Sequence, residues 1–145
     1  DLKKLMTFET FDHTADIGLR IQAASLAELL VEAAHGLTSV ICERHESIRP
    51  LRTKEWSIDF DPNEHEDLLF DWLCEILYAF DAEHELLNDF QVSLEGNKLI
   101  GSARGEKIDV DRHVIDMDVK AITYHGLLVK QELDGAWTAE VILDL

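Results

Sequence analysis

The sequence predicts an α+β fold, a two-layer sandwich in which two main helices pack on one face of a mostly antiparallel sheet. Three observations predict it: two long stretches with apolar residues at helical spacing, several short stretches of alternating apolar and polar residues, and two glycine-containing hairpin turns. The chain has 145 residues, the length of one ordinary domain, with no internal repeat and no Pro- or Gly-rich linker. We therefore expect a single domain over residues 1–145.

The first half of the chain begins with two predicted strands and a helix. Residues 7–11 and 18–24 alternate apolar and polar side chains as strands do. Ser25 and Glu28 have the spacing of a capping box, so a helix should begin there and run to about Cys42. Its apolar residues recur at helical spacing and form one buried stripe: Leu26, Leu29, Leu30, Ala33, Leu37, Val40 and Ile41.

A third strand and a second helix follow. Residues 53–61 alternate apolar residues with charges, which predicts a half-buried strand that ends before Pro62. Asn63 and Glu66 then have the spacing of a second capping box. The apolar stripe of this helix is Leu69, Trp72, Leu73, Ile76, Leu77 and Phe80.

The second half of the chain is predicted to consist of strands. Gly96-Asn97 and Asp134-Gly135 are two-residue hairpin signals between alternating stretches. The segment GSARGEK (101–107) lacks the Lys-Ser/Thr pair of a phosphate-binding loop. Its alternating small residues suit a strand that another element approaches closely.

The charge balance excludes several classes of partner. The sequence has 30 Asp and Glu against 13 Lys and Arg, a net charge of −17. Because phosphate groups are bound mainly through Lys and Arg, we expect no direct binding to nucleic acid or to an anionic membrane. A basic protein surface or a cation is the better partner. No apolar run of about 18 residues and no signal-peptide pattern is present, which predicts a cytoplasmic protein, and the two cysteines predict free thiols.

Carboxylates gather near both ends of the chain. Asp12, His13 and Asp16 precede the second strand, and the last strand ends in Asp144 and the carboxylate of Leu145. If this last strand pairs with the strand that follows Asp16, the two aspartates meet at one edge of the sheet. Their oxygens would then suit Ca²⁺, Mg²⁺ or Mn²⁺. The alternatives are a solvated turn and a frayed terminus. Residues 109–118 carry further aspartates but lack the glycine of a calcium loop, which favours a solvated connection or a weak cation site.

Three segments together resemble the archease family: FDHTADIGLRI (11–21), DVKAITYH (118–125) and the terminal VILDL. The stretch DLLFDWLCEILYAF (67–80) is also similar to the second helix of that family. The resemblance implies an accessory protein, not itself an enzyme, that activates the RtcB-type GTP-dependent RNA ligase of tRNA splicing and RNA repair. It would promote guanylylation of the ligase and multiple turnover through a carboxylate-bound divalent cation.

The resemblance also implies site residues. The metal-binding residues of the family fall on Asp16, Asp144 and Leu145, with Leu145 contributing through its backbone or terminal carboxylate. Four residues match the motifs as supporting residues: Asp12, His13, Lys120 and His125. The implied cofactor is a divalent cation, with Ca²⁺ expected in a crystal and Mg²⁺ or Mn²⁺ as candidates in function.

Two other functions remain open from the sequence. An acidic chaperone or adaptor that shields a basic client protein would explain the net charge. A metal-dependent hydrolase would use the same carboxylates, but it needs a general base and a substrate pocket, and the sequence marks neither.

Overall fold

The computed structural model describes residues 6–13 and 16–145, except for the side chains of Asp12 and His13. In this part of the chain the strands form two antiparallel sheets. The five-stranded sheet has β8 (Trp137–Asp144) between β2 (Asp16–Ala23) on one side and β6 (Ala121–Ile122) and β7 (Leu128–Gln131) on the other; β1 (Thr7–His13) pairs with β2. The three-stranded sheet has β5 (Lys98–Lys107) between β3 (Arg52–Asp59) and β4 (Glu85–Glu95).

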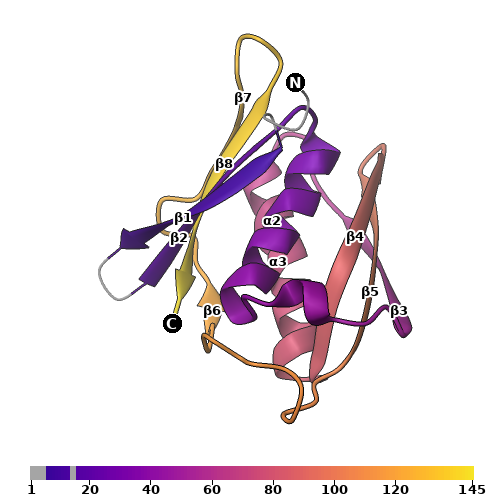
Figure 1. Ribbon diagram of the computed structural model, residues 1–145. Helices are drawn as coiled ribbons and strands as arrows, with labels where there is room; N and C mark the ends of the chain where they lie inside the picture. Colours follow the sequence, from indigo (N-terminus) through magenta and orange to yellow (C-terminus); the bar gives the residue numbers. More distant parts are fainter. Residues whose placement is uncertain (1–5, 14–15) are drawn as a thin grey trace.

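The two long helices, α2 (Leu26–Ile41) and α3 (His65–Asp81), lie between the sheets (Figure 1). Helix α2 contacts β1, β2 and β8 of the larger sheet and β4 of the smaller one, and α3 contacts β4, β6 and β7. The predicted α+β class is confirmed, but the strands form two sheets with the helices between them and not one sheet with both helices on one face. The strands divide between two sheets because buried residues occupy most of the circumference of α2, so this helix can pack on both sides.

Helix α2 begins where the sequence predicts. The Glu28 N–H donates to Ser25 Oγ at 3.2 Å, which is the first half of the predicted capping box. At the other end, the Cys42 N–H donates to the Thr38 carbonyl and closes the last turn. The predicted bounds of this helix are confirmed, and both cysteines of the chain are free.

Helix α3 starts later than its sequence suggests. The predicted N-cap at Asn63 is wrong, because the Asn63 N–H donates to Asp61 Oδ1 at 2.9 Å in a turn that precedes the helix. The predicted stripe is buried around Trp72, whose indole N–H donates to the Leu30 carbonyl of α2 at 2.8 Å. Among the described residues, no helix is long and apolar enough to cross a membrane.

Both predicted hairpin turns are present, with Gly96 at φ +64° and Gly135 at φ +93°. The prediction that strand 98–107 is closely approached is also confirmed. A Cβ on Gly101 would lie 2.6 Å from the Trp72 ring, and one on Gly105 would overlap the Leu86 carbonyl oxygen. The small residues therefore let α3 and β4 pack directly against this strand.

A buried ionic network fastens the segment between β5 and β6. Glu106 is 7% exposed, forms an ion pair with Arg112 and accepts the Arg49 N–H at 2.5 Å. His113 Nδ1 accepts the Asp109 N–H, so its Nε2 carries the proton and donates to Glu106 at 3.2 Å. Burial raises the pKa of the Glu106 carboxyl, but hydrogen bonds from Arg112, the Arg49 backbone and His113 outweigh burial and lower it to about 2. The network holds the segment that follows β5 against the chain around Arg49.

Candidate functional site

Two aspartates lie opposite each other where β2 begins and β8 ends. The two strands pair in the register Asp16↔Asp144, as the sequence analysis expected from the strand pattern. Directly opposed residues of an antiparallel pair project from the same face of the sheet, with Cβ atoms about 4.5–5.5 Å apart. Two carboxylates from distant parts of the sequence are therefore within reach of one cation.

The aspartates project from the face of the sheet that points away from the helices. Residues 139, 141 and 143 of β8 are buried against the helices, and Asp144 alternates with them. One row along this outer face, the ring of Phe11 lies over Gly18, where any side chain would overlap it. Beyond the ring, the Arg20 guanidinium stacks on Phe11 at 4.7 Å and pairs with Glu9 and Glu140. The ring separates this ion-pair cluster from the aspartate pair.

The segment 120–125 is hydrogen-bonded to the end of β8. The Lys120 N–H donates to the Asp144 carbonyl at 2.8 Å, and Ala121 is the register partner of Asp144. The Thr123 N–H and hydroxyl both donate to the Ile142 carbonyl, at 3.1 and 3.0 Å. These contacts fix Lys120 next to Asp144 through its backbone. His125 lies at the exposed turn beyond β6, with its N–H 3.3 Å from Thr123 Oγ1.

The remaining predicted site residues are Leu145, Asp12 and His13. Leu145 directly follows Asp144, and its side chain packs against the core, which holds its backbone beside the aspartate pair. In β1, His13 is the register partner of Asp16 through the backbone. The side chains of Asp12 and His13 lie outside the described residues, so their supporting roles stay predictions.

The residues that the structure describes offer two carboxylates but not a closed metal cage. Among those side chains, no group of three or more His, Cys, Asp or Glu is placed to bind a metal. Oxygen donors from Asp16, Asp144 and the Leu145 backbone fit a hard divalent cation that keeps coordination positions for water or a partner. In the 109–118 segment, the Asp116 carboxylate instead accepts the Glu43 N–H at 2.7 Å, which agrees with a connecting loop.

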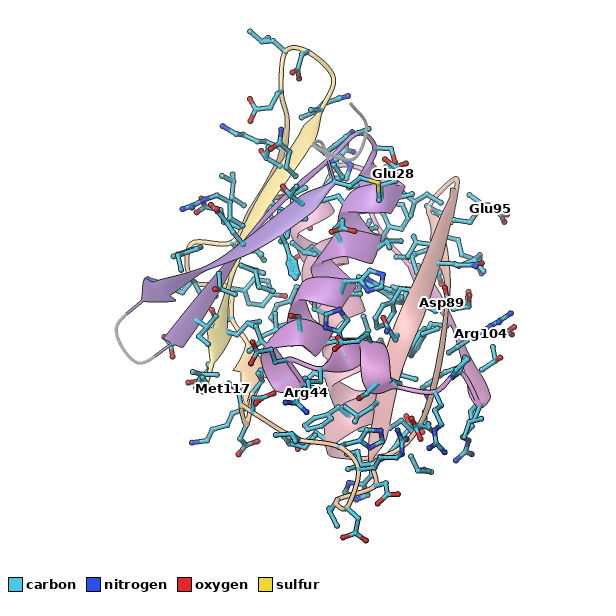
Figure 2. The ribbon with its side chains drawn as sticks, in the orientation of Figure 1. Glu28, Arg44, Asp89, Glu95, Arg104 and Met117 are labelled. Carbon is cyan, nitrogen blue, oxygen red and sulfur yellow. The ribbon has the colours of Figure 1, made fainter. Side chains whose placement is uncertain are left out.

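Aromatic and apolar side chains near the end of β8 were not predicted from the sequence. The rings of Phe70 on α3 and Tyr124 stack with centroids 3.9 Å apart and 15° between planes. A second apolar row on α3, Phe70, Cys74 and Tyr78 at spacings of four, is the signal that would have indicated this wall. Figure 2 shows Met117 close to the end of β8, and this side chain is 40% exposed. Exposed apolar surface thus lies near the end of β8.

The sequence matches a family model described as the Archease protein family (MTH1598/TM1083) over residues 8–145. The chain is 40% identical to protein archease of Methanopyrus kandleri over 144 residues, covering 97% of this chain and 100% of the relative. It is 36% identical to protein archease of Pyrococcus furiosus over 143 residues, covering 95% and 98% of the two chains.

Two solved structures share the fold. The solution structure of Methanobacterium thermoautotrophicum protein 1598 matches with a TM-score of 0.77 at 30% identity, covering 95% of this chain and 98% of that one. The crystal structure of an archease from Thermotoga maritima, described as a possible chaperone, matches with a TM-score of 0.63 at 25% identity, covering 94% and 96%. The resemblance noted from the sequence is therefore confirmed over nearly the whole chain.

Proposed function

The chain belongs to the archease family, and from that premise we propose that it activates an RtcB-type RNA ligase in tRNA splicing and RNA repair. The proposed role is accessory: it promotes guanylylation of the ligase and repeated turnover, and it joins no RNA itself. The observation that carries the proposal is the register pair Asp16↔Asp144, which gathers negative oxygens from both ends of the chain at one exposed sheet edge.

In this proposal the aspartate pair holds a divalent cation. Like charges directly opposite each other on a sheet repel, and a cation between them removes that cost. The Asp16 and Asp144 carboxylates and the Leu145 backbone would bind the ion from one side, and the other side would face the ligase. When bound, the cation supplies positive charge beside phosphate oxygens of GTP. The chain's own part is to present the oxygens at fixed spacing, because the strand ladder and the contacts of segment 120–123 hold them in place.

The net charge supports a basic protein partner. A chain with net charge −17 is attracted to the positive surface on which a ligase binds RNA, and this attraction speeds encounter at low ionic strength. No direct contact of this chain with RNA is required.

The test is the rate of ligase guanylylation in GTP and Mn²⁺, with and without this protein. We expect Asp16→Ala and Asp144→Ala each to reduce the stimulated rate at least tenfold. Glu55→Gln is the matched control, because Glu55 is an exposed acidic residue on β3 of the other sheet. Stimulation at the wild-type level by both aspartate variants would rule out the carboxylate mechanism.

A second function is an acidic chaperone or adaptor, favoured by the description of the Thermotoga maritima relative as a possible chaperone. This function predicts that the total negative charge of the surface determines the effect on the ligase, and that no single site residue is required for it. Reversing several exposed acidic residues of β3 and β4 would then abolish the effect on the ligase, whereas Asp16→Ala would leave it intact. The opposite pattern supports the carboxylate mechanism.

A further inference from the structure

A hollow of about 330 Å³ lies between helix α3 and β6, near the end of β8. Phe70, Cys74 and Tyr78 of α3 form one wall, and Lys120 and the β6 residues form the other. Because Ala121 of this second wall is the register partner of Asp144, the hollow lies one strand away from the end of β8, on the helix side of the sheet. Small-molecule sites have volumes of roughly 300–1,000 Å³, so this hollow matches one long side chain better than a nucleotide.

Aromatic rings lie in the α3 wall of the hollow, where Phe70 and Tyr78 line it, and next to that wall, where Tyr124 stacks on Phe70. Tyr78 is 61% exposed and Tyr124 is 58% exposed, so both rings have free surface that a partner can cover. Tyr124 is held in place by its stack on Phe70. Rigid, exposed aromatic rings of this kind bind planar cations through the face of the ring.

Negative charge surrounds the same rings. Asp81 lines the hollow, and partial burial together with the charges of Asp67 and Asp71 raises the pKa of Tyr124. Burial and the charges of Asp71 and Glu75 likewise raise the pKa of the Cys74 thiol to about 11. Burial is the largest cause of both pKa shifts, and the neighbouring carboxylates add to it. The lining itself holds one acidic residue, Asp81, and one basic residue, Lys120. The excess of negative charge comes from Asp67, Asp71 and Glu75 of α3, which act on Tyr124 and Cys74 from outside the lining.

We propose that this hollow receives an arginine side chain of the protein partner, held between the aromatic rings and the α3 aspartates. A guanidinium stacks flat on an aromatic ring while it donates hydrogen bonds to carboxylates at its edge, which an ammonium group does less well. The occupant is a protein side chain because the negative charge around the hollow repels phosphate. The inference rests on the proposed function in taking the ligase as the source of the arginine. The bound arginine would then fix the position of the aspartate pair relative to the ligase.

The first test needs no ligase. The isotope-labelled chain is titrated with the peptide Ac-Gly-Arg-Gly-NH₂ and with its lysine and citrulline counterparts, and amide signals are followed by NMR. We expect saturable shifts confined to residues 70–81 and 120–125 with the arginine peptide, several-fold weaker binding of the lysine peptide, and none of the citrulline peptide. Tyr78→Ala and Asp71→Asn should each weaken the arginine response, whereas Tyr78→Phe should retain it. Equal responses to arginine and lysine spread over the acidic surface would overturn the proposal.

The second test measures the Kd for the ligase. We expect Tyr78→Ala to raise this Kd about tenfold and to raise the concentration needed for half-maximal stimulation. Leu133→Ala is the control, because Leu133 is fully exposed in the β7–β8 hairpin at the other end of β8, and it should change neither. A wild-type Kd for Tyr78→Ala would overturn the arginine site while leaving the proposed function standing. If the wild-type chain neither binds nor stimulates the ligase, the proposed function and the ligase as arginine source both fail, and the peptide titration alone decides whether the hollow binds arginine.

Discussion

Replacing Glu106 with glutamine would measure how much the ionic network between β5 and β6 contributes to stability. Glutamine keeps the length of the side chain and can still accept the Arg49 N–H. It removes the negative charge that faces Arg112 and the His113 N–H. Breaking one partner of a buried pair leaves the other with its charge uncompensated, which destabilises a protein more than the pair itself stabilises it.

The pKa of Glu106 sets the size of the effect. The carboxyl has a pKa of about 2 in the folded chain against an ordinary value of 4.5. At about 1.4 kcal/mol per pKa unit, the difference corresponds to an upper value of about 3.5 kcal/mol at pH 7. Arg112 is 27% exposed, so solvent screening reduces the expected loss to about 2–3 kcal/mol. A lowered carboxyl pKa contributes stability above the unfolded value of 4.5, and this contribution is lost as the pH falls toward 2.

The measurement is urea denaturation of wild type and Glu106→Gln at pH 7 and at pH 3.5. Because glutamine does not titrate in this range, the difference in unfolding free energy should shrink by roughly 40% at the lower pH. Glu55→Gln, at an exposed position on β3, should change the unfolding free energy by less than about 0.5 kcal/mol. A difference between wild type and Glu106→Gln that is equal at the two pH values would refute the assignment of the stability to the ionised carboxylate.

Three further changes test the packing and the site. Gly105→Ala should lower the free energy of unfolding, measured by urea denaturation, by at least about 3 kcal/mol, because the new Cβ overlaps the Leu86 carbonyl of β4 and the backbone must move. A decrease of less than about 1 kcal/mol would show that the β4–β5 contact is looser than described. Ser25→Ala should lower the free energy of unfolding by about 1 kcal/mol, because the N-cap hydrogen bond is lost. Ser25→Gly should lower it by less, because glycine is a better N-cap residue than alanine. Asp144→Asn should leave the chain as stable as wild type or more stable in EDTA, since it removes repulsion from Asp16. A thermal melt in EDTA that shows a large destabilisation by Asp144→Asn would contradict this.

Local sequence patterns predicted most of the elements that build the site. Apolar residues at helical spacing gave α2 its bounds, and Asp134-Gly135 placed the turn before the last strand. The alternation of β2 and β8 then limited how the strands could pair, because a shift of one residue would turn the buried face of each strand to solvent. The sequence offered the pairing of Asp16 with Asp144 as one interpretation, beside a solvated turn and a frayed terminus, and the structure has this pairing.

Features that depend on contacts between distant segments could not be predicted in the same way. Asn63 has the pattern of an N-cap, but the Asp61 side chain takes its N–H first, a competition that spacing alone does not reveal. The aspartate-rich segment 109–118 gave no sign that His113 would be buried against Glu106. The stack of Phe70 on Tyr124 joins residues 54 positions apart. Division of the strands between two sheets likewise depends on tertiary packing of both faces of the helices.

The two acidic features at the end of β8 require the same kind of partner. The Asp16–Asp144 pair places two carboxylates directly opposite each other in the ladder of β2 and β8. The hollow one strand away exposes aromatic rings among aspartates, an arrangement that stabilises the free chain little. A positively charged partner would interact favourably with both features. On the proposed function, an arginine anchored in the hollow would fix the distance between the partner and the aspartates, so that the carboxylates meet the ligase at one defined place instead of along the whole acidic surface.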